Sequence, residues 1–134
     1  TGANLANARI IGTLGDVDMS GAIITKGRLG LDVGNQPMGQ MKFDSSGGSF
    51  VKANFEGADL NIASFIFGDL RGANLRNTNL NRAELVKADL RGADLTDADL
   101  TDADVDGANF EGVIGLSTIK GFLTVKGKCE NCGM

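Results

Sequence analysis

The aspartate-rich stretch DADVDGANFEGV, Asp102 to Val113, has side chains at a spacing that could hold a calcium ion. It opens D-x-D-x-D-G, as an EF-hand loop does, because alternating oxygen ligands can converge on one hard cation. The match fails at the twelfth position, where Val113 replaces the bidentate Glu, and at the eighth, where Asn109 replaces an apolar residue. We therefore expect no metal site here beyond weak attraction of a cation to clustered carboxylates.

The second candidate for chemistry is the pair Cys129 and Cys132, a C-x-x-C motif near the end of the chain. Four interpretations are open: a structural disulfide, free thiols, redox catalysis, and zinc shared between two chains. Redox catalysis favours a first cysteine at a helix N-terminus in a βαβ setting, and zinc needs four ligands where this chain offers two cysteines and no His. We expect the disulfide, which would contribute only about 2 kcal/mol because its loop is short. A disulfide indicates an oxidising compartment.

The composition excludes most other kinds of active site. The 134 residues include no His, so the commonest general base and metal ligand is missing. Thirteen Lys and Arg against 17 Asp and Glu give a net charge of −4, which disfavours nucleic acid bound through its phosphates. No apolar run approaches the roughly 20 residues of a membrane span. We expect one domain, no catalytic residues, no cofactor and no metal.

The elements that position these residues follow from an internal repeat. From Gly48 to Gly112 the sequence reads in fives, with a small first residue and a large apolar third residue in every unit. A period of five would scatter the apolar residues around an α-helix, which turns about every 3.6 residues. Small and large residues two apart instead share one side of an extended segment, and one turn per unit keeps each pair inside. The predicted core residues are Phe50, Phe55, Leu60, Phe65, Leu70, Leu75, Leu80, Leu85, Leu90, Leu95, Leu100, Val105 and Phe110.

The unit A-[DN]-L-x-x, repeated without a gap, resembles the pentapeptide repeat proteins. The resemblance implies an all-β fold, a right-handed quadrilateral β-helix with four pentapeptides per turn and the large residues stacked inside. Residues twenty apart would then lie on successive coils, about 4.8 Å apart. Burial of each large side chain contributes roughly 1.5 to 3 kcal/mol, so this solenoid should fold without a cofactor.

The repeat divides the chain into four segments. Residues 1–25 are degenerate pentapeptides with one four-residue unit, and residues 48–113 are the regular pentapeptide repeats. Residues 26–47 hold the only proline and no sustained period, so we expect an inserted loop that folds back on the solenoid. Residues 114–134 have apolar residues at near-helical spacing, and we expect a C-terminal cap that could be helical and that contains the C-x-x-C motif.

Two groups of outward-facing residues form the predicted interaction surface. The first group is apolar, and it could be covered by the inserted loop or bind a partner: Ile62, Ile66, Phe67 and Val86. The second group is an acidic wall without basic neighbours in its own stretch of sequence: Asp97, Asp99, Asp102, Asp104 and Asp106.

These patterns favour a non-enzymatic repeat scaffold that binds an unknown protein partner. The short solenoid, apolar loop, capping tail and paired cysteines resemble the pentapeptide repeat proteins of the chloroplast thylakoid lumen or of cyanobacteria, which implies localisation in that lumen. Some members of the family are DNA mimics that bind DNA gyrase, and this is the alternative function. A thiol–disulfide redox protein acting through Cys129 and Cys132 is a further alternative. We expect no nucleic-acid partner, and a monomer rather than a dimer.

Overall fold

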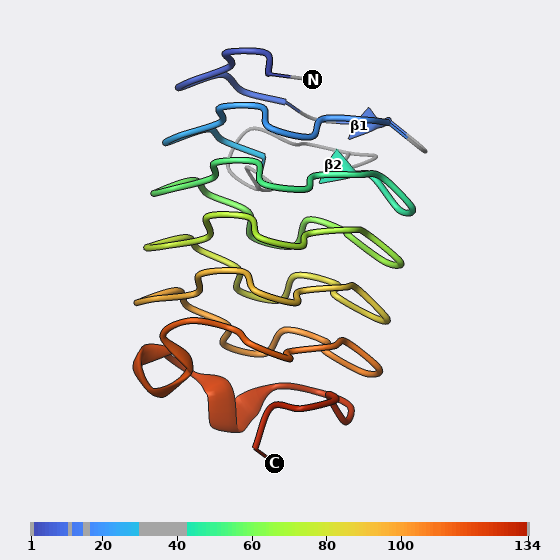
Figure 1. The fold of residues 1–134 in the computed structure, drawn as a ribbon, viewed down its shortest axis with the longest axis vertical. Helices are drawn as coiled ribbons and strands as arrows, with labels where there is room; N and C mark the ends of the chain where they lie inside the picture. Colours follow the sequence, from blue (N-terminus) through green and yellow to red (C-terminus); the bar gives the residue numbers. More distant parts are fainter. Residues whose placement is uncertain (1, 11, 15–16, 30–42, 134) are drawn as a thin grey trace, which may run out of the picture.

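The chain winds into a stack of coils with its N-terminus at one end and its C-terminus at the other (Figure 1). The computed structural model describes residues 2–10, 12–14, 17–29 and 43–133. Its regular elements are short: β1 (Gly12–Thr13), β2 (Phe43–Asp44), and the 3-10 helices η2 (Leu116–Thr118) and η3 (Phe122–Thr124). Parallel β-bridges join successive coils, so bridges rather than long strands build the solenoid. In the described ranges we find no helix with the length and apolarity of a membrane span.

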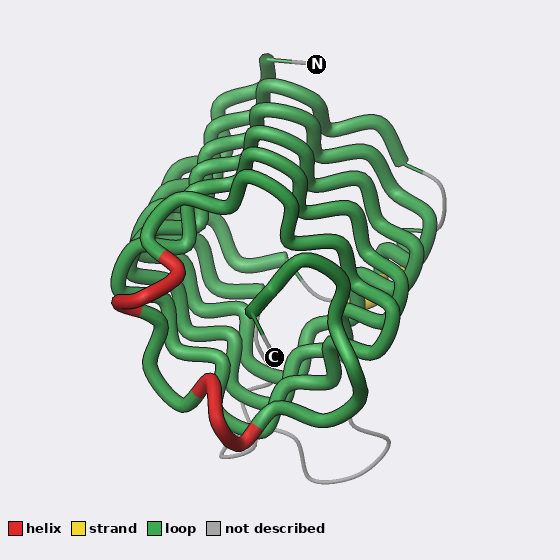
Figure 2. The backbone as a smooth tube through the Cα atoms, turned by 60° about the horizontal axis from the view of Figure 1, so that its bottom comes forward, coloured by secondary structure: helices red, strands yellow, loops and turns green. Residues whose placement is uncertain are grey.

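Pairing between the regular coils follows a step of twenty residues. Ser49 pairs with Asp69, Asp69 with Asp89, and Asp89 with Asn109, and the other walls keep the same step. The large residues predicted for the core are each at most 1% exposed. They stack in columns, because residues twenty apart pair across successive coils. The backbone around them has a four-sided outline in a view toward the C-terminal end (Figure 2).

A single unit shows why five residues suffice for one wall and one turn. The Phe50 amide donates to the Asp69 carbonyl of the next coil at 2.7 Å, and the Ala53 amide donates back to the Phe50 carbonyl at 3.0 Å. Lys52, the third residue of that turn, has a φ of 59°, which lies in the left-handed region. The unit therefore pairs its backbone with its neighbours and changes direction once.

The N-terminal coil keeps a different step. Asn4 pairs with Ile23 and Arg9 with Arg28, nineteen residues apart, as a single four-residue unit in this region requires.

The insertion is shorter at its start than the predicted range 26–47. Residues 26–29 continue the second coil, because Leu29 is fully buried and Arg28 pairs with Asp59. Residues 30–42, with the fold-back predicted for them, lie outside the described residues.

The insertion also ends earlier than predicted, because β2 pairs with β1 and already belongs to the coil. In this unit the order of large and small residues is inverted. Phe43 occupies the position of Ala63 in the next coil, Ser45 occupies that of Phe65, and both are fully buried. The Phe43 ring lies 5.7 Å from the Phe65 ring and fills the space that Ser45 leaves. Because its third residue is small, this unit does not match the pattern of the regular repeats.

The C-terminal segment forms one more coil and not an α-helical cap. Ile114, Lys120 and Lys126 pair with Asp94, Asp99 and Asp104 of the coil before it. The units here are six residues long, VIGLST and IKGFLT, and η2 and η3 accommodate the additional residue. A period of six also places apolar residues three apart, which is why the spacing looked helical.

This last coil closes the end of the core. Val113, Ile119 and Val125 take the inward positions that alanine holds in earlier coils, and Leu116 and Phe122 pack against the buried cluster. The Phe122 ring lies 5.7 Å from the ring of Phe110, the last large residue of the regular repeats.

Candidate functional surface

The aspartates and asparagines that precede most of the large core residues have a structural role. Asp104 Oδ1 accepts the Asp106 amide at 3.1 Å, and Asp99 Oδ1 accepts both the amide and the hydroxyl of Thr101, at 3.0 and 2.6 Å. These are Asx turns, and an amide oxygen serves as well, as the Asn109 bond to the Glu111 amide shows. Turn geometry therefore accounts for the acidic pattern between Asp102 and Val113. Within the described residues, no group of three or more acidic or cysteine side chains could hold a metal ion.

The acidic wall has basic neighbours that the local sequence did not reveal. The last coil places Lys120 opposite Asp99 and Lys126 opposite Asp104 in the β-bridge pairing. The Lys128 amide donates to Asp106 Oδ1 at 3.1 Å. These lysines reduce the negative field of the wall.

Asp97 and Asp102 are exposed at corners of the same coil, with φ of 59° and 58°. Their amides donate to the hydroxyls of Thr118 and Thr124 in the last coil, at 2.8 and 2.9 Å. Their carboxylates remain at the surface.

The apolar residues of the predicted surface fall on two separate corners. Phe67 is 63% exposed, its amide donates to the Val86 carbonyl at 3.0 Å, and the Lys87 ammonium lies 5.6 Å from its ring centre. Ile66 and Val86 are half-buried beside it. We call Phe67, Lys87, Ile66 and Val86 together the Phe67 corner. Ile62 belongs to the preceding corner of the coil, where its amide donates to Asn81.

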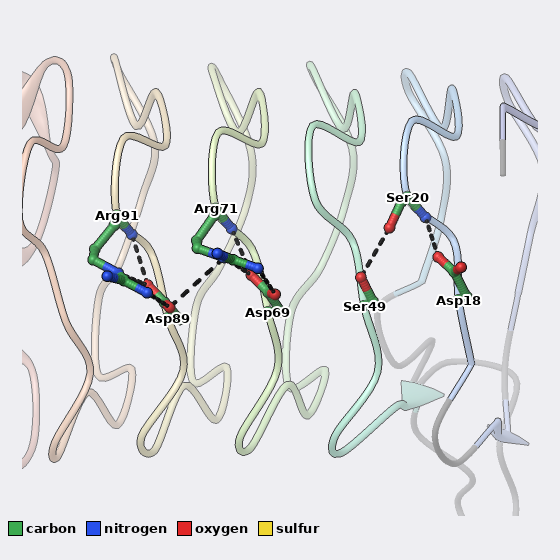
Figure 3. A network of polar contacts seen from close by, with 7 residues as sticks. All are labelled: Asp18, Ser20, Ser49, Asp69, Arg71, Asp89 and Arg91. Carbon is green, nitrogen blue, oxygen red and sulfur yellow. Dashed lines mark hydrogen bonds and ion pairs between the residues drawn. The ribbon is translucent and has the colours of Figure 1, made fainter.

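Sequence reasoning missed a ladder of ion pairs on another wall, shown in Figure 3. Arg71 Nη2 lies 2.7 Å from Asp69 Oδ2, and its Nε lies 3.9 Å from Asp89 Oδ2 in the next coil. Arg91 repeats the contact with Asp89 at 2.7 Å. The signal was the tripeptide DLR, which occurs twice at a step of twenty residues.

The same wall continues toward the N-terminus without arginine. The Asp18 carboxylate accepts the Ser20 amide at 3.0 Å, and this bond lowers the pKa of Asp18. The hydroxyl oxygens of Ser20 and Ser49, on adjacent coils, lie 2.8 Å apart.

The ladder predicts a pH dependence of stability. The hydrogen bond from Arg71 lowers the pKa of Asp69, and that from Arg91 lowers the pKa of Asp89. A carboxylate whose folded pKa is below its unfolded value, about 3.9, stabilises the fold fully above that pH and loses this contribution as the pH falls through the folded pKa. We expect Asp69→Asn with Asp89→Asn, which keep the Asx turn, to lower the free energy of unfolding at pH 7 by about 1 kcal/mol, because both pairs are exposed.

Urea unfolding near neutral pH and in strong acid measures this difference. Below the folded pKa values the double variant should equal the wild type. The matched variant Arg71→Gln with Arg91→Gln, which removes the donors instead, should show the same pattern. A difference between wild type and the Asp variant that persisted unchanged in strong acid would contradict the assignment.

The two cysteines are joined in a disulfide at the end of the last coil, with Cα atoms 5.9 Å apart. Cys129 is 5% exposed and Cys132 is 3% exposed, and both belong to the core cluster. The Glu130 amide donates to the Ala108 carbonyl at 2.7 Å, so Cys129 continues the inward column of alanines. A buried pair in a coil position, away from any helix N-terminus, fits a structural disulfide better than redox catalysis.

Short β-bridged coils, an inward column of large residues and a positive φ at most corners define a β-solenoid protein. A family model described as pentapeptide repeats matches residues 46–77 and 73–112, with eight copies. The chain therefore belongs to the pentapeptide repeat family. No curated protein sequence matches it significantly.

Two solved structures are similar along most of the chain. A pentapeptide repeat protein of the Arabidopsis thaliana thylakoid lumen matches with a TM-score of 0.54 and 27% identity, over 74% of this chain and 60% of that protein. HetL, a pentapeptide repeat protein involved in regulating heterocyst differentiation in the cyanobacterium Nostoc, matches with a TM-score of 0.61 and 26% identity, over 97% of this chain and 58% of its own. The chain thus spans about three fifths of the length of either protein. These relatives imply a right-handed β-helix, and they indicate no enzymatic family.

Proposed function

We propose that this chain is a non-catalytic scaffold that binds another protein through the Phe67 corner. The observation that carries the proposal is the exposure of Phe67 at its corner. Its φ of 57° puts a bulky residue in the left-handed region, where glycine or asparagine is favoured, and 63% of it faces solvent. Other corners of the solenoid share this left-handed turn position, at Lys52 and Ile62 for example, so the distinctive feature of Phe67 is a large aromatic ring exposed there.

The surroundings of Phe67 suit a protein partner. Ile66 and Val86 extend the apolar area, and Lys87 supplies a charge at its edge. Aromatic side chains, Phe among them, are enriched at the cores of protein interfaces, so an exposed Phe beside aliphatic side chains suits such a contact. A partner with an apolar side chain next to a carboxylate would complement this corner.

The thylakoid lumen is the proposed location. The similarity to the Arabidopsis thaliana lumenal protein supports it, and so does the buried disulfide, which persists best in an oxidising compartment.

The DNA-mimic alternative is disfavoured by the charge distribution. A mimic of DNA needs a continuous negative face, and the acidic coil here lies directly against Lys120 and Lys126 of the last coil. On the ladder wall, Arg71 and Arg91 neutralise the aspartates beside them.

Site-specific cross-linking tests the proposal. A photoreactive amino acid at position 67 should cross-link a protein from lumenal extract, and the same group at position 77 should not. Asn77 is the matched control, because it is exposed at the same turn position of another corner, with the same φ of 57°. A cross-link to residues 30–42 of the same chain would show instead that the protein covers its own patch.

The variant Phe67→Asn separates binding from folding. Asparagine tolerates the left-handed conformation, so we expect the free energy of unfolding to stay equal or to rise by up to about 1 kcal/mol, while binding to the cross-linked partner is lost. Thermal unfolding and a pull-down with the purified partner measure the two effects. Unchanged binding by Phe67→Asn would rule out this corner as the interaction surface.

A further inference from the structure

A second corner of the solenoid carries a different chemical pattern, which the proposed function does not use. Ile62, Arg82 and Asp102 occupy the same turn position in successive coils, with φ of 61°, 58° and 58°. The Ile62 amide donates to Asn81, and the Arg82 amide donates to Thr101 in the coil after it. In the last coil, η3 continues this corner with Leu123, whose neighbour Thr124 accepts the Asp102 amide. We call these four residues the Arg82 corner: Ile62, Arg82, Asp102 and Leu123.

The two charged side chains of this corner have no ion-pair partner in the part of the chain that the structure describes. Arg71, Arg76 and Arg91 lie within 4.0 Å of a carboxylate, but the Arg82 guanidinium pairs with none of the described residues, and neither does the Asp102 carboxylate with a cation. Leu123 is 96% exposed. Arg82 and Asp102 also line a groove of about 450 Å³ together with Ile62.

We propose that this corner binds a second copy of the chain, with the two solenoids side by side and antiparallel. Along the solenoid axis, consecutive coils present an apolar, a positive, a negative and an apolar side chain at this corner. When a second copy runs in the opposite direction, its side chains come in the reverse order, and each one meets a complementary side chain. We place the two-fold axis perpendicular to both solenoid axes, between the coil of Arg82 and the coil of Asp102. Each Arg82 guanidinium then faces the Asp102 carboxylate of the partner copy. The same rotation places Ile62 against Leu123 of the partner copy, so one self-complementary patch forms the whole contact.

The residues of the column next to this corner, on the same wall, are also self-complementary under this two-fold rotation. It presents Asp59, Asn79, Asp99 and Lys120 in consecutive coils. Reversal about the same axis brings Asp59 opposite Lys120 and the Asn79 amide opposite the Asp99 carboxylate. Because both copies repeat their coils about every 4.8 Å, all these pairs meet in a single register.

Other arrangements of two copies are unfavourable. A parallel arrangement in register would place Arg82 against Arg82 and Asp102 against Asp102. Moving the two-fold axis by half a coil, onto the coil of either residue, also opposes like charges. Like-charge contacts suppress such alternatives, so the charges specify the antiparallel register.

The sequence favoured a monomer, and this proposal departs from that expectation. The contact uses one wall only, so the dimer should be weak and reversible, and it should dissociate as salt screens the charges. It leaves the Phe67 corner unoccupied, so the dimer and the proposed partner can be tested separately.

Sedimentation equilibrium of the full chain over a range of protein and salt concentrations tests the proposal. The variants are Arg82→Asp and Asp102→Arg, which exchange residue types that both already occupy this left-handed corner. Each single variant opposes like charges twice across the two-fold axis, and it should weaken self-association at least about tenfold. An equimolar mixture of the two variants restores opposite charges, and it should associate as the wild type does. The chain carrying both substitutions should dimerise as well.

The control is Lys52→Asp, which reverses a charge at a left-handed position of a different corner, with a φ of 59°. It should dimerise like the wild type, and circular dichroism should show every variant folded. A wild-type chain that stays monomeric at millimolar concentration overturns the proposal. So does a dimer that survives both single variants, or a mixture of the two that fails to associate.

Discussion

Replacing Leu80 with Asp should unfold the protein. Leu80 is 1% exposed, and it stacks between Leu60 and Leu100 in the central column of one wall. An aspartate there would lose the apolar burial of leucine and would place an unpaired carboxyl group among aliphatic side chains. We expect the free energy of unfolding to fall by at least about 5 kcal/mol, which is comparable with the whole stability of a small domain. Circular dichroism and urea unfolding measure the loss.

Two controls separate the buried charge from lost packing. Leu80→Ala removes the side chain without adding charge and should cost about 2 to 5 kcal/mol. Asn77→Asp adds the same charge at an exposed corner three residues away and should change stability by less than about 0.5 kcal/mol. An Asp variant at position 80 with the melting temperature of the wild type would refute the stacked core.

The sequence predicted the regular coils well because a single period encodes both their geometry and their core. In each unit the large residue points inward and the small residue is buried beside it, and in most units the Asp or Asn before the large residue closes a turn. Since these requirements recur every five residues, Phe50 already identifies the wall of Leu70 and Leu90. The twenty-residue register came from the family resemblance, and the β-bridges follow it.

The irregular parts could not be predicted because they fill the same core with residues in a different order or at a different spacing. Phe43 and Ser45 exchange their positions, and the large ring restores the volume that the small side chain lacks. In the last coil the period lengthens to six, marked by Gly115, Gly121 and Gly127 at equal spacing. That spacing was the signal that could have shown a coil instead of a helical cap.

The candidate surfaces were predicted only in part for a geometric reason. Residues five apart stand on adjacent corners, whereas residues twenty apart stack on the same corner. Ile62 and Phe67 are therefore neighbours in sequence but belong to different surfaces, while Phe67 meets Lys87. The lysines opposite Asp99 and Asp104 were hidden because the last coil departs from the step of twenty.

The glycines of the last coil are required by close contact as well as by conformation. Gly121 has a φ of 69°, and a Cβ atom there would lie 2.7 Å from the Thr101 Cα and 2.9 Å from the Thr101 Cβ. Contacts this short with backbone need a shift of the coil, because a main-chain atom cannot rotate away. The 3-10 turn η3 follows Gly121 directly, so the shift would also disturb Phe122, which packs against the core.

We therefore expect Gly121→Ala to lower the free energy of unfolding by about 2 to 4 kcal/mol, from left-handed strain and overpacking together. Gly92→Ala is the matched control: its φ is 71°, but a Cβ there meets nothing within 4 Å. It should lose only about 1 kcal/mol, from strain alone. Urea unfolding of both variants measures the difference, and hydrogen exchange should report the Gly121 effect in residues 113–132. Equal losses in the two variants would mean that the last coil does not pack closely on the acidic coil, and that the core is not closed at this end by η2 and η3.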